Sequence, residues 1–205
     1  MRGAFSLALL WAATAGSFAC ENGLDSAGVT SDTLLAVPVL TGTVTSDGLA
    51  SESTTPYTGD NDLTDPGQRV RGFVTFELTT IPAGKVVRTA FLKIPQRGVD
   101  GTPYNDLGVV VLDHLLLGAT LDSDDFEAAA LDSAFVSLST DPALATRTVN
   151  VFPQIKADVE AGRDVSQFRL RFSVNDGDND DVTDRAAFNG TGDVPPPIVI
   201  VTFNE

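Results

Sequence analysis

Two stretches of the chain alternate apolar and polar residues with a period of two, and this alternation constrains the fold more than any other feature. The first stretch runs from Val70 to Leu78 and the second from Gln167 to Val174. Successive side chains of a β-strand point to opposite faces, so the period predicts strands with one face on a core. In the second stretch, the residues predicted to point inward are Phe168, Leu170, Phe172 and Val174, and those predicted to point outward are Arg169, Arg171 and Ser173.

Further strands are predicted between turns rich in glycine and proline. Leu34–Val44 is one of them, although Pro38 within it indicates an edge or a break. Val109–Leu117 is apolar on both faces apart from Asp113 and His114, which favours a central strand. The remaining predicted strands are Val86–Ile94, Phe135–Ser139, Thr148–Phe152 and Ile198–Phe203.

Two short helices interrupt these strands. In Asp122–Leu131, acidic residues precede an alanine-rich stretch, a pattern typical of a helix start. Pro153 opens a second segment in which Ile155 and Val159 share a face, and Gly162 ends it. The sequence therefore predicts an all-β fold, an antiparallel β-sandwich of jelly-roll type with one or two short helices.

The N-terminal segment is typical of an export signal. In residues 1–19, Arg2 precedes an apolar run that is too short to span a bilayer comfortably, and small residues follow it. Cleavage after Ala19 would leave Cys20 first, as in a bacterial lipoprotein, although Ser17 departs from the usual aliphatic residue of that pattern. We expect a lipoprotein on the bacterial outer membrane or cell surface; the alternative is a secreted protein with one spare cysteine.

The rest of the chain divides into a tether and one domain. Residues 20–33 are poor in apolar side chains and predict a flexible tether, whereas residues 34–205 have the length of a single domain. Cys20 is the only cysteine, so no disulfide within the chain is possible and burial must hold the fold.

The formal net charge of −15 limits the partners of this chain. Nucleic acids are recognised through clustered Lys and Arg, so nucleic-acid binding is not expected. Anionic lipid headgroups are not expected as ligands for the same reason, which leaves the N-terminal lipid as the expected contact with a membrane. Strong negative charge suits both solubility and cation binding.

An acidic segment follows the second alternating stretch. Its candidate calcium ligands are Asp176, Asp178, Asp180, Asp181 and Asp184, of which the first three are spaced so that short carboxylates can converge. The segment is not an EF-hand loop, because Asp181 and Ala187 stand where that motif needs Gly and Glu. The alternative is a solvated acidic turn. Asp60 and Asp62 would join a site only if their loop folds nearby.

The run from Arg71 to Leu78, ending in Ile81 and Pro82, resembles the opening of DNRLRE or disaggregatase-related domains, which are grouped with carbohydrate-binding module family 96. The likeness continues through the order of later strands and spans roughly Leu34 to Glu205. The resemblance implies a jelly-roll module of a secreted or surface protein that binds acidic polysaccharide. Such domains usually carry tryptophans in the middle of the chain, whereas Trp11 is the only one here and leaves with the signal.

Four residues are therefore the candidate sugar contacts. Tyr57 and Tyr104 are in predicted loops, where each is either a ligand-stacking ring or a loop anchor. Arg169 and Arg171 project from one strand face, where they either meet acidic sugars or form a solvated face paired with Asp and Glu.

Catalysis has no positive signal in the sequence. His114 and Asp113 are neighbours in a predicted strand, so their side chains point to opposite faces and cannot readily pair. The chain has no HExxH helix, GxSxG elbow or zinc-binding Cys and His cluster. We expect a non-catalytic module that binds polysaccharide or a cell-envelope component. A structural or adhesive envelope lipoprotein is the alternative, and a hydrolase is the third hypothesis.

Overall fold

The computed structural model describes residues 28–48, 50–51, 54–61, 67–174, 177–178 and 180–204. The predicted signal of residues 1–19, the lipidation candidate Cys20, and Asp62 and Asp176 lie outside these residues. The described strands are β1 Val29–Leu35, β2 Gly42–Thr45, β3 Ala50–Ser51, β4 Tyr57–Asp60, β5 Arg69–Glu77, β6 Val87–Asp100, β7 Val110–Leu115, β8 Asp132–Ser139, β9 Thr146–Asn150, β10 Val165–Phe172, β11 Arg185–Phe188 and β12 Ile198–Asn204. The described helices are α1 Pro103–Asp106, α2 Phe152–Glu160 and the 3-10 turns η1 Pro38–Leu40 and η2 Ser123–Glu127.

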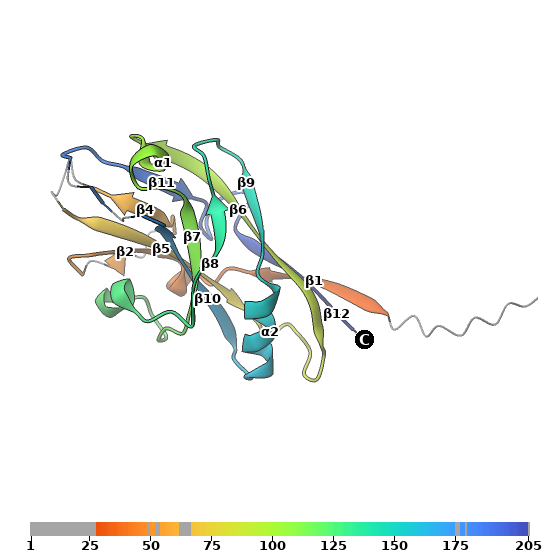
Figure 1. The fold of residues 1–205 in the computed structure, drawn as a ribbon. Coiled ribbons are helices and arrows are strands. Elements are labelled where there is room, and N and C mark those ends of the chain that lie inside the picture. The colour runs from red at the N-terminus through yellow and green to blue at the C-terminus, as the bar shows by residue number, and fades with distance from the viewer. Residues whose placement is uncertain are drawn as a thin grey trace, which may run out of the picture.

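The strands form one large antiparallel sheet, drawn in Figure 1. Its main path runs β1-β12-β6-β11-β4-β5-β10-β7-β8. Off this path, β2 pairs with β5 and with β3, and β9 pairs with β6. The predicted antiparallel, mostly β fold with two short α-helices is thus confirmed. None of the helices in the described part of the chain is long and apolar enough to span a membrane.

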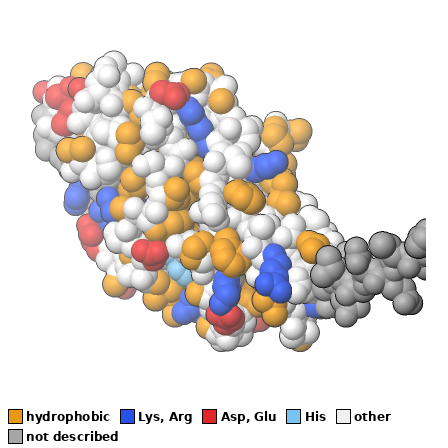
Figure 2. All heavy atoms as spheres, turned by 45° about the vertical axis from the view of Figure 1, so that its right-hand side comes forward, with side chains coloured by type: hydrophobic (Ala, Val, Ile, Leu, Met, Phe, Trp, Pro, Cys, Tyr) orange, Lys and Arg blue, Asp and Glu red, His pale blue; other side chains and the backbone are white. Residues whose placement is uncertain are grey.

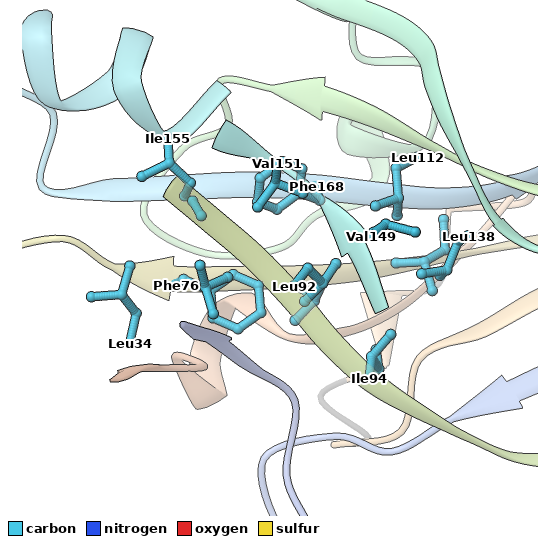
Figure 3. Close-up of a cluster of buried hydrophobic side chains, with 14 of the residues drawn as sticks. Leu34, Phe76, Leu92, Ile94, Leu112, Leu138, Val149, Val151, Ile155 and Phe168 are labelled. Carbon is cyan, nitrogen blue, oxygen red and sulfur yellow. The ribbon is translucent and has the colours of Figure 1, made fainter. Parts of the chain in front are cut away.

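One hydrophobic core collects side chains from two parts of this sheet. The first part, made of β1, β12, β9 and the first half of β6, contributes Leu34 and Leu92. The second part, made of β5, β10, β7 and β8, contributes Phe76, Phe168 and Leu112. Figure 3 shows these side chains lying together, and the rings of Phe76 and Phe168 are 6.3 Å apart at their centroids. Because both parts face the same core, the sheet curves around it.

Strand β6 connects the two parts of the sheet. Its first half pairs with β12 on one edge and β9 on the other, and its second half pairs with β11. The sequence predicts a strand only as far as Ile94, because Gly98 and Gly101 indicate turns after that point. The strand continues to Asp100 because β11 supplies new backbone partners. Long-range pairing here outweighs the local glycine signal.

The first strand begins earlier than the sequence predicts. Val29–Leu35 pairs with β12 along its whole length, so the segment assigned to a flexible tether is a strand from Val29 onward. Its polar residues Thr30 and Asp32 are only partly exposed, and Leu34 is fully buried. These three side chains share one face of β1, and Ser31 and Thr33 are exposed on the other face. Polar residues on both faces explain why the stretch reads as a tether.

A second layer covers the side of the sheet away from the main core. Phe73 of β5 and Leu115 of β7 pack there against Phe126 of η2. The prediction that Arg169 and Arg171 form a solvated strand face is therefore wrong for Arg169, whose side chain is only 7% exposed. The η2 segment, far away in the sequence, covers this face.

The predicted helix at Asp122–Leu131 is the short 3-10 turn η2. Its start follows the prediction, because Asp122 accepts a hydrogen bond from the backbone N–H of Asp124 and Asp125 completes a capping box. It ends early because the carbonyl oxygens of Phe126 and Ala128 accept hydrogen bonds from Arg169 Nη1, at 3.0 and 2.9 Å. The side chain of Arg169 thus occupies carbonyl oxygens that would accept backbone hydrogen bonds in a longer helix.

Helix α2 confirms the second predicted helix. Pro153 lies in its first turn, and Gly162 follows its last turn with a φ of +68°, the left-handed conformation that glycine adopts freely. Ile155 is fully buried, and Gln154 and Asp158 are buried beside it. The face that α2 turns to the sheet therefore carries two polar side chains that the periodicity does not predict.

Candidate functional site

The acidic residues predicted to bind calcium are only partly brought together. Asp178 and Asp184 converge with Asp106, and one carboxylate oxygen of each lies within 4.8 Å of the others. Asp106 is in α1 and was not predicted as a ligand, because no sequence pattern connects it with Asp178 and Asp184, which lie about seventy positions later in the chain. Asp180 instead accepts a hydrogen bond from the backbone N–H of Val182 at 2.8 Å, and Asp181 is exposed outside the group. Figure 2 shows acidic side chains gathered at the end of the molecule where α1 and β11 lie in Figure 1.

Asp184 is the buried member of this group, with 1% of the residue exposed. Its carboxylate accepts a hydrogen bond from the backbone N–H of Thr102. The backbone N–H of Asp184 donates to Asp60 Oδ1 at 2.9 Å. The loop of Asp60 therefore does fold next to the acidic group, which the sequence alone did not decide. Burial raises the pKa of Asp184; the Thr102 hydrogen bond opposes this rise, and the negative charges of Asp106, Asp180 and Asp178 add to it.

Carboxylate oxygens are the ligands that calcium prefers, and the group contains neither sulfur nor imidazole. Three side chains are fewer than the six to eight oxygens that calcium takes, so backbone carbonyls and water would complete a site. The chemistry of this group therefore fits a hard cation, with Asp106, Asp178 and Asp184 as its ligands.

The two predicted tyrosines have different surroundings. Tyr104 lies in α1, where its hydroxyl donates to Gln96 Oε1 at 2.6 Å and its ring meets Phe172 edge-on. Tyr57 lies in β4 and is half-buried, with the guanidinium carbon of Arg185 4.8 Å from its ring centroid. Tyr104 therefore anchors α1 to the sheet, and Tyr57 already has a cation on its ring.

Asp113 binds both predicted arginines, of which Arg169 is buried and Arg171 is partly buried. Arg169 and Arg171 both donate to Asp113 Oδ2, from Nη2 at 2.8 Å and from Nε at 2.9 Å respectively. Asp113 also accepts from the backbone N–H of Ala134 at 2.7 Å. Both guanidinium groups therefore form ion pairs with a carboxylate of the protein itself.

An aromatic ring for which the sequence predicts no role in a site lies on the outer face of the sheet. Phe91 of β6 is 41% exposed and pairs with Ile200 of β12 on one side and Asn150 of β9 on the other. Residues directly opposite in an antiparallel pair project to the same face. Lys93, two residues further along β6, pairs with Ile198 and therefore extends the same face. This face, centred on Phe91, is called the outer platform. The alternation in Val86–Ile94 could have indicated this exposed ring, because Phe91 and the buried Leu92 are neighbours in a strand and therefore point to opposite faces of the sheet.

His114 points to the other side of β7 from Asp113, as the sequence predicts. Its ring faces Phe168 at a centroid distance of 5.6 Å, and its Nε2 lies 2.8 Å from Asp158 Oδ2 of helix α2. The partner of the histidine is thus an aspartate 44 residues away, which the sequence does not indicate.

No protein-family model matches this chain, and no curated protein is detectably similar to it.

Proposed function

We propose that this chain is an exported, non-catalytic module of the bacterial cell envelope that binds polysaccharide and is anchored by a lipid on Cys20. The observation that carries the binding proposal is the exposed ring of Phe91 on the outer platform. A large apolar side chain in an exposed patch that is rimmed by polar groups is typical of an interaction surface.

The residues around Phe91 fit a sugar chain better than an apolar partner. Asn150 and Thr148 of β9 are exposed beside Phe91 and Lys93, and Thr33 of β1 is exposed beyond Ile200. The ring offers a flat apolar area to the C–H face of a pyranose at low entropic cost, while hydroxyl, amide and ammonium groups meet its hydroxyls. Lys93 favours a chain that carries some negative charge.

A β-sandwich of jelly-roll type is part of the same proposal. Its support is the curved sheet, of which two parts contribute to one core. The polysaccharide ligand is proposed from the order of strands in which the sequence resembles DNRLRE domains.

Two matched variants test the platform. Phe91→Ala removes the ring, and Leu144→Ala removes a more exposed apolar side chain from the loop before β9, where Leu144 is 66% exposed. Losing the burial of a phenylalanine costs about 1.5–3 kcal/mol, which is roughly tenfold or more in affinity. Isothermal titration with neutral and acidic polysaccharides should show this loss for Phe91→Ala alone. Equal affinities for the two variants, or no binding by the wild-type protein, would exclude the platform.

A calcium ion at the acidic group is a second element of the proposal. It would join the segment that carries Asp178 to α1, and any ligand selective for the native state raises the melting temperature. Calcium should raise the melting temperature of the wild-type protein above its value in a chelator, and Asp178→Asn should reduce this rise. Asp181→Asn is the control, because it removes the same charge outside the group. An identical rise in both variants would argue against this site.

The lipid anchor is tested in cells. Labelling with a fatty-acid analogue should mark the wild-type protein and not a Cys20→Ala variant, which should leave the membrane fraction. A structural envelope lipoprotein without a glycan ligand is the alternative, favoured by the internal hydrogen bonds of Tyr104, Arg169 and Arg171. It predicts lipid labelling together with no polysaccharide binding.

A further inference from the structure

A hollow that is separate from the outer platform lies between helix α2 and the ends of β7 and β8. Its volume is about 320 Å³, at the lower end of the roughly 300–1,000 Å³ that is typical of ligand pockets. The residues that line it are His114, Leu131, Asp132, Pro153, Gln154, Ala157 and Arg163. Figure 2 shows the pale-blue edge of the one histidine among hydrophobic side chains on this side of the molecule. This hollow is called the α2 pocket.

The α2 pocket contains a buried acceptor that lacks a donor. Gln154 is 6% exposed, and among the described residues its Oε1 has no hydrogen-bond partner. Its Nε2 donates to Asp132 Oδ2 at 2.9 Å, and a carboxylate can only accept, so the orientation of the amide is fixed. A buried carbonyl oxygen without a donor destabilises the fold, so a donor from outside the chain would stabilise it.

Arg163, which also lines the pocket, offers donors that are held in place. Asp158 is 1% exposed and binds two neighbours, His114 through Oδ2 and Arg163 Nη1 through Oδ1. The backbone N–H of Arg163 also donates to the backbone carbonyl of Asp158, at 3.0 Å. The side chain of Arg163 is 27% exposed, and within the described part of the chain its Nε and Nη2 have no acceptor. These N–H groups therefore remain for a ligand.

Gln154 and Arg163 together restrict the chemistry of the ligand. The group at Gln154 must donate, and the group at Arg163 must accept. A hydroxyl group does both, so a ring with several hydroxyls can satisfy both side chains. Asp132 lines the pocket, and Asp158 binds two of its lining residues. These two negative charges against one from Arg163 disfavour an anionic ligand. Leu131, Pro153 and Ala157 supply apolar surface for the C–H groups of such a ring.

We propose that the α2 pocket binds one neutral, polyhydroxylated ring of monosaccharide size, either free or at the end of a glycan. Gln154 accepts a hydrogen bond from one hydroxyl, and Arg163 donates to another. Asp158 is a positioning residue, because it holds His114 and Arg163 without facing the ligand. This site does not depend on the outer platform, which binds along a chain.

The test is titration of the isotope-labelled wild-type protein with glucose, galactose, inositol and glucuronate, followed by NMR. A neutral ring should shift the side-chain amide signals of Gln154, and glucuronate should bind more weakly. The same rings are then compared with oligosaccharides that end in them, which distinguishes a free ligand from a chain end. If no ring shifts the Gln154 signals, the acceptor is satisfied by water alone and the proposal is overturned.

Matched variants separate this pocket from the outer platform. Gln154→Met keeps the length of the side chain and removes the acceptor, and Lys156→Met is the control on the exposed side of α2. Binding of the ring should fall about tenfold or more in Gln154→Met and stay unchanged in Lys156→Met and Phe91→Ala. Equal binding by Gln154→Met and the wild-type protein would overturn the proposal. Loss of polymer binding in Phe91→Ala, with ring binding intact, would concern the platform only.

Discussion

Arg169 and Asp113 form a buried ion pair between β10 and β7, in which Arg169 Nε and Nη2 both donate to Asp113 Oδ2, at 3.0 and 2.8 Å. Removing one member of a buried pair leaves the other charge uncompensated, which typically costs about 3–5 kcal/mol. Asp113→Asn should lower the free energy of unfolding in urea by about this amount. Asp100→Asn is the control, since its pair with Arg185 is exposed and worth about 1 kcal/mol or less. Similar losses in both variants would contradict this account.

The same aspartate should make stability fall in acid. Burial alone would raise the pKa of Asp113, but hydrogen bonds from Arg171, the backbone of Ala134 and Arg169 outweigh it and lower the pKa below its ordinary value. A lowered folded-state pKa stabilises the protein above the unfolded-state pKa of about 3.9, and this contribution is lost as the pH falls through the folded-state value. Melting temperatures measured from pH 6 to pH 2 should therefore decline more steeply in the wild-type protein than in Asp113→Asn. Parallel curves would show that Asp113 does not contribute to the decline.

Asp184 should have the opposite effect on stability. Its pKa is raised, first by burial and then by nearby carboxylates. The charged form is thus disfavoured in the folded protein, and stability is lost as the pH rises through the folded-state pKa. In a chelator at pH 7, Asp184→Asn should melt at a higher temperature than the wild-type protein, and the difference should vanish below pH 3. A lower melting temperature at pH 7 would mean that the carboxylate has another stabilising partner.

Gly59 and Gly84 form a matched test of close backbone contact. Both have positive φ, +127° and +80°, but only Gly59 meets a neighbour, because an added Cβ would lie 2.0 Å from the carbonyl oxygen of Asp184. A non-glycine residue at positive φ costs about 1–2 kcal/mol, so Gly84→Ala should lose only this much in chemical denaturation. Gly59→Ala should lose clearly more, because β4 and β11 must separate. Equal losses would mean that the two strands can shift freely.

The parts of the fold that the sequence predicts are those with a local pattern. β5 and β10 follow the two alternating stretches, and α2 lies between Pro153 and Gly162. β4 and β11 have four residues each, and these short strands give no periodic signal. They are strands because they pair with each other and with β5 and β6, which are distant in the sequence.

The sites were harder to predict than the fold, because each depends on contacts across the chain. Asp184 could be proposed as an acidic ligand, but its approach to Asp106 follows from the pairing of β11 with β6. Arg169 was expected in solvent, and η2 covers it instead. The acceptor of Gln154 has no sequence signal, since a glutamine in a helix is ordinarily exposed.

The pairing of β1 with β12 has a mechanical consequence. The seven residues of β1 run antiparallel to β12, and Val29, where β1 begins, lies opposite Asn204 near the end of the chain. A pull applied at Val29 along the strand therefore strains all the hydrogen bonds between the two strands at once, in shear, instead of opening them one after another. A domain that is held by its N-terminus in flowing liquid would gain resistance to unfolding from this geometry.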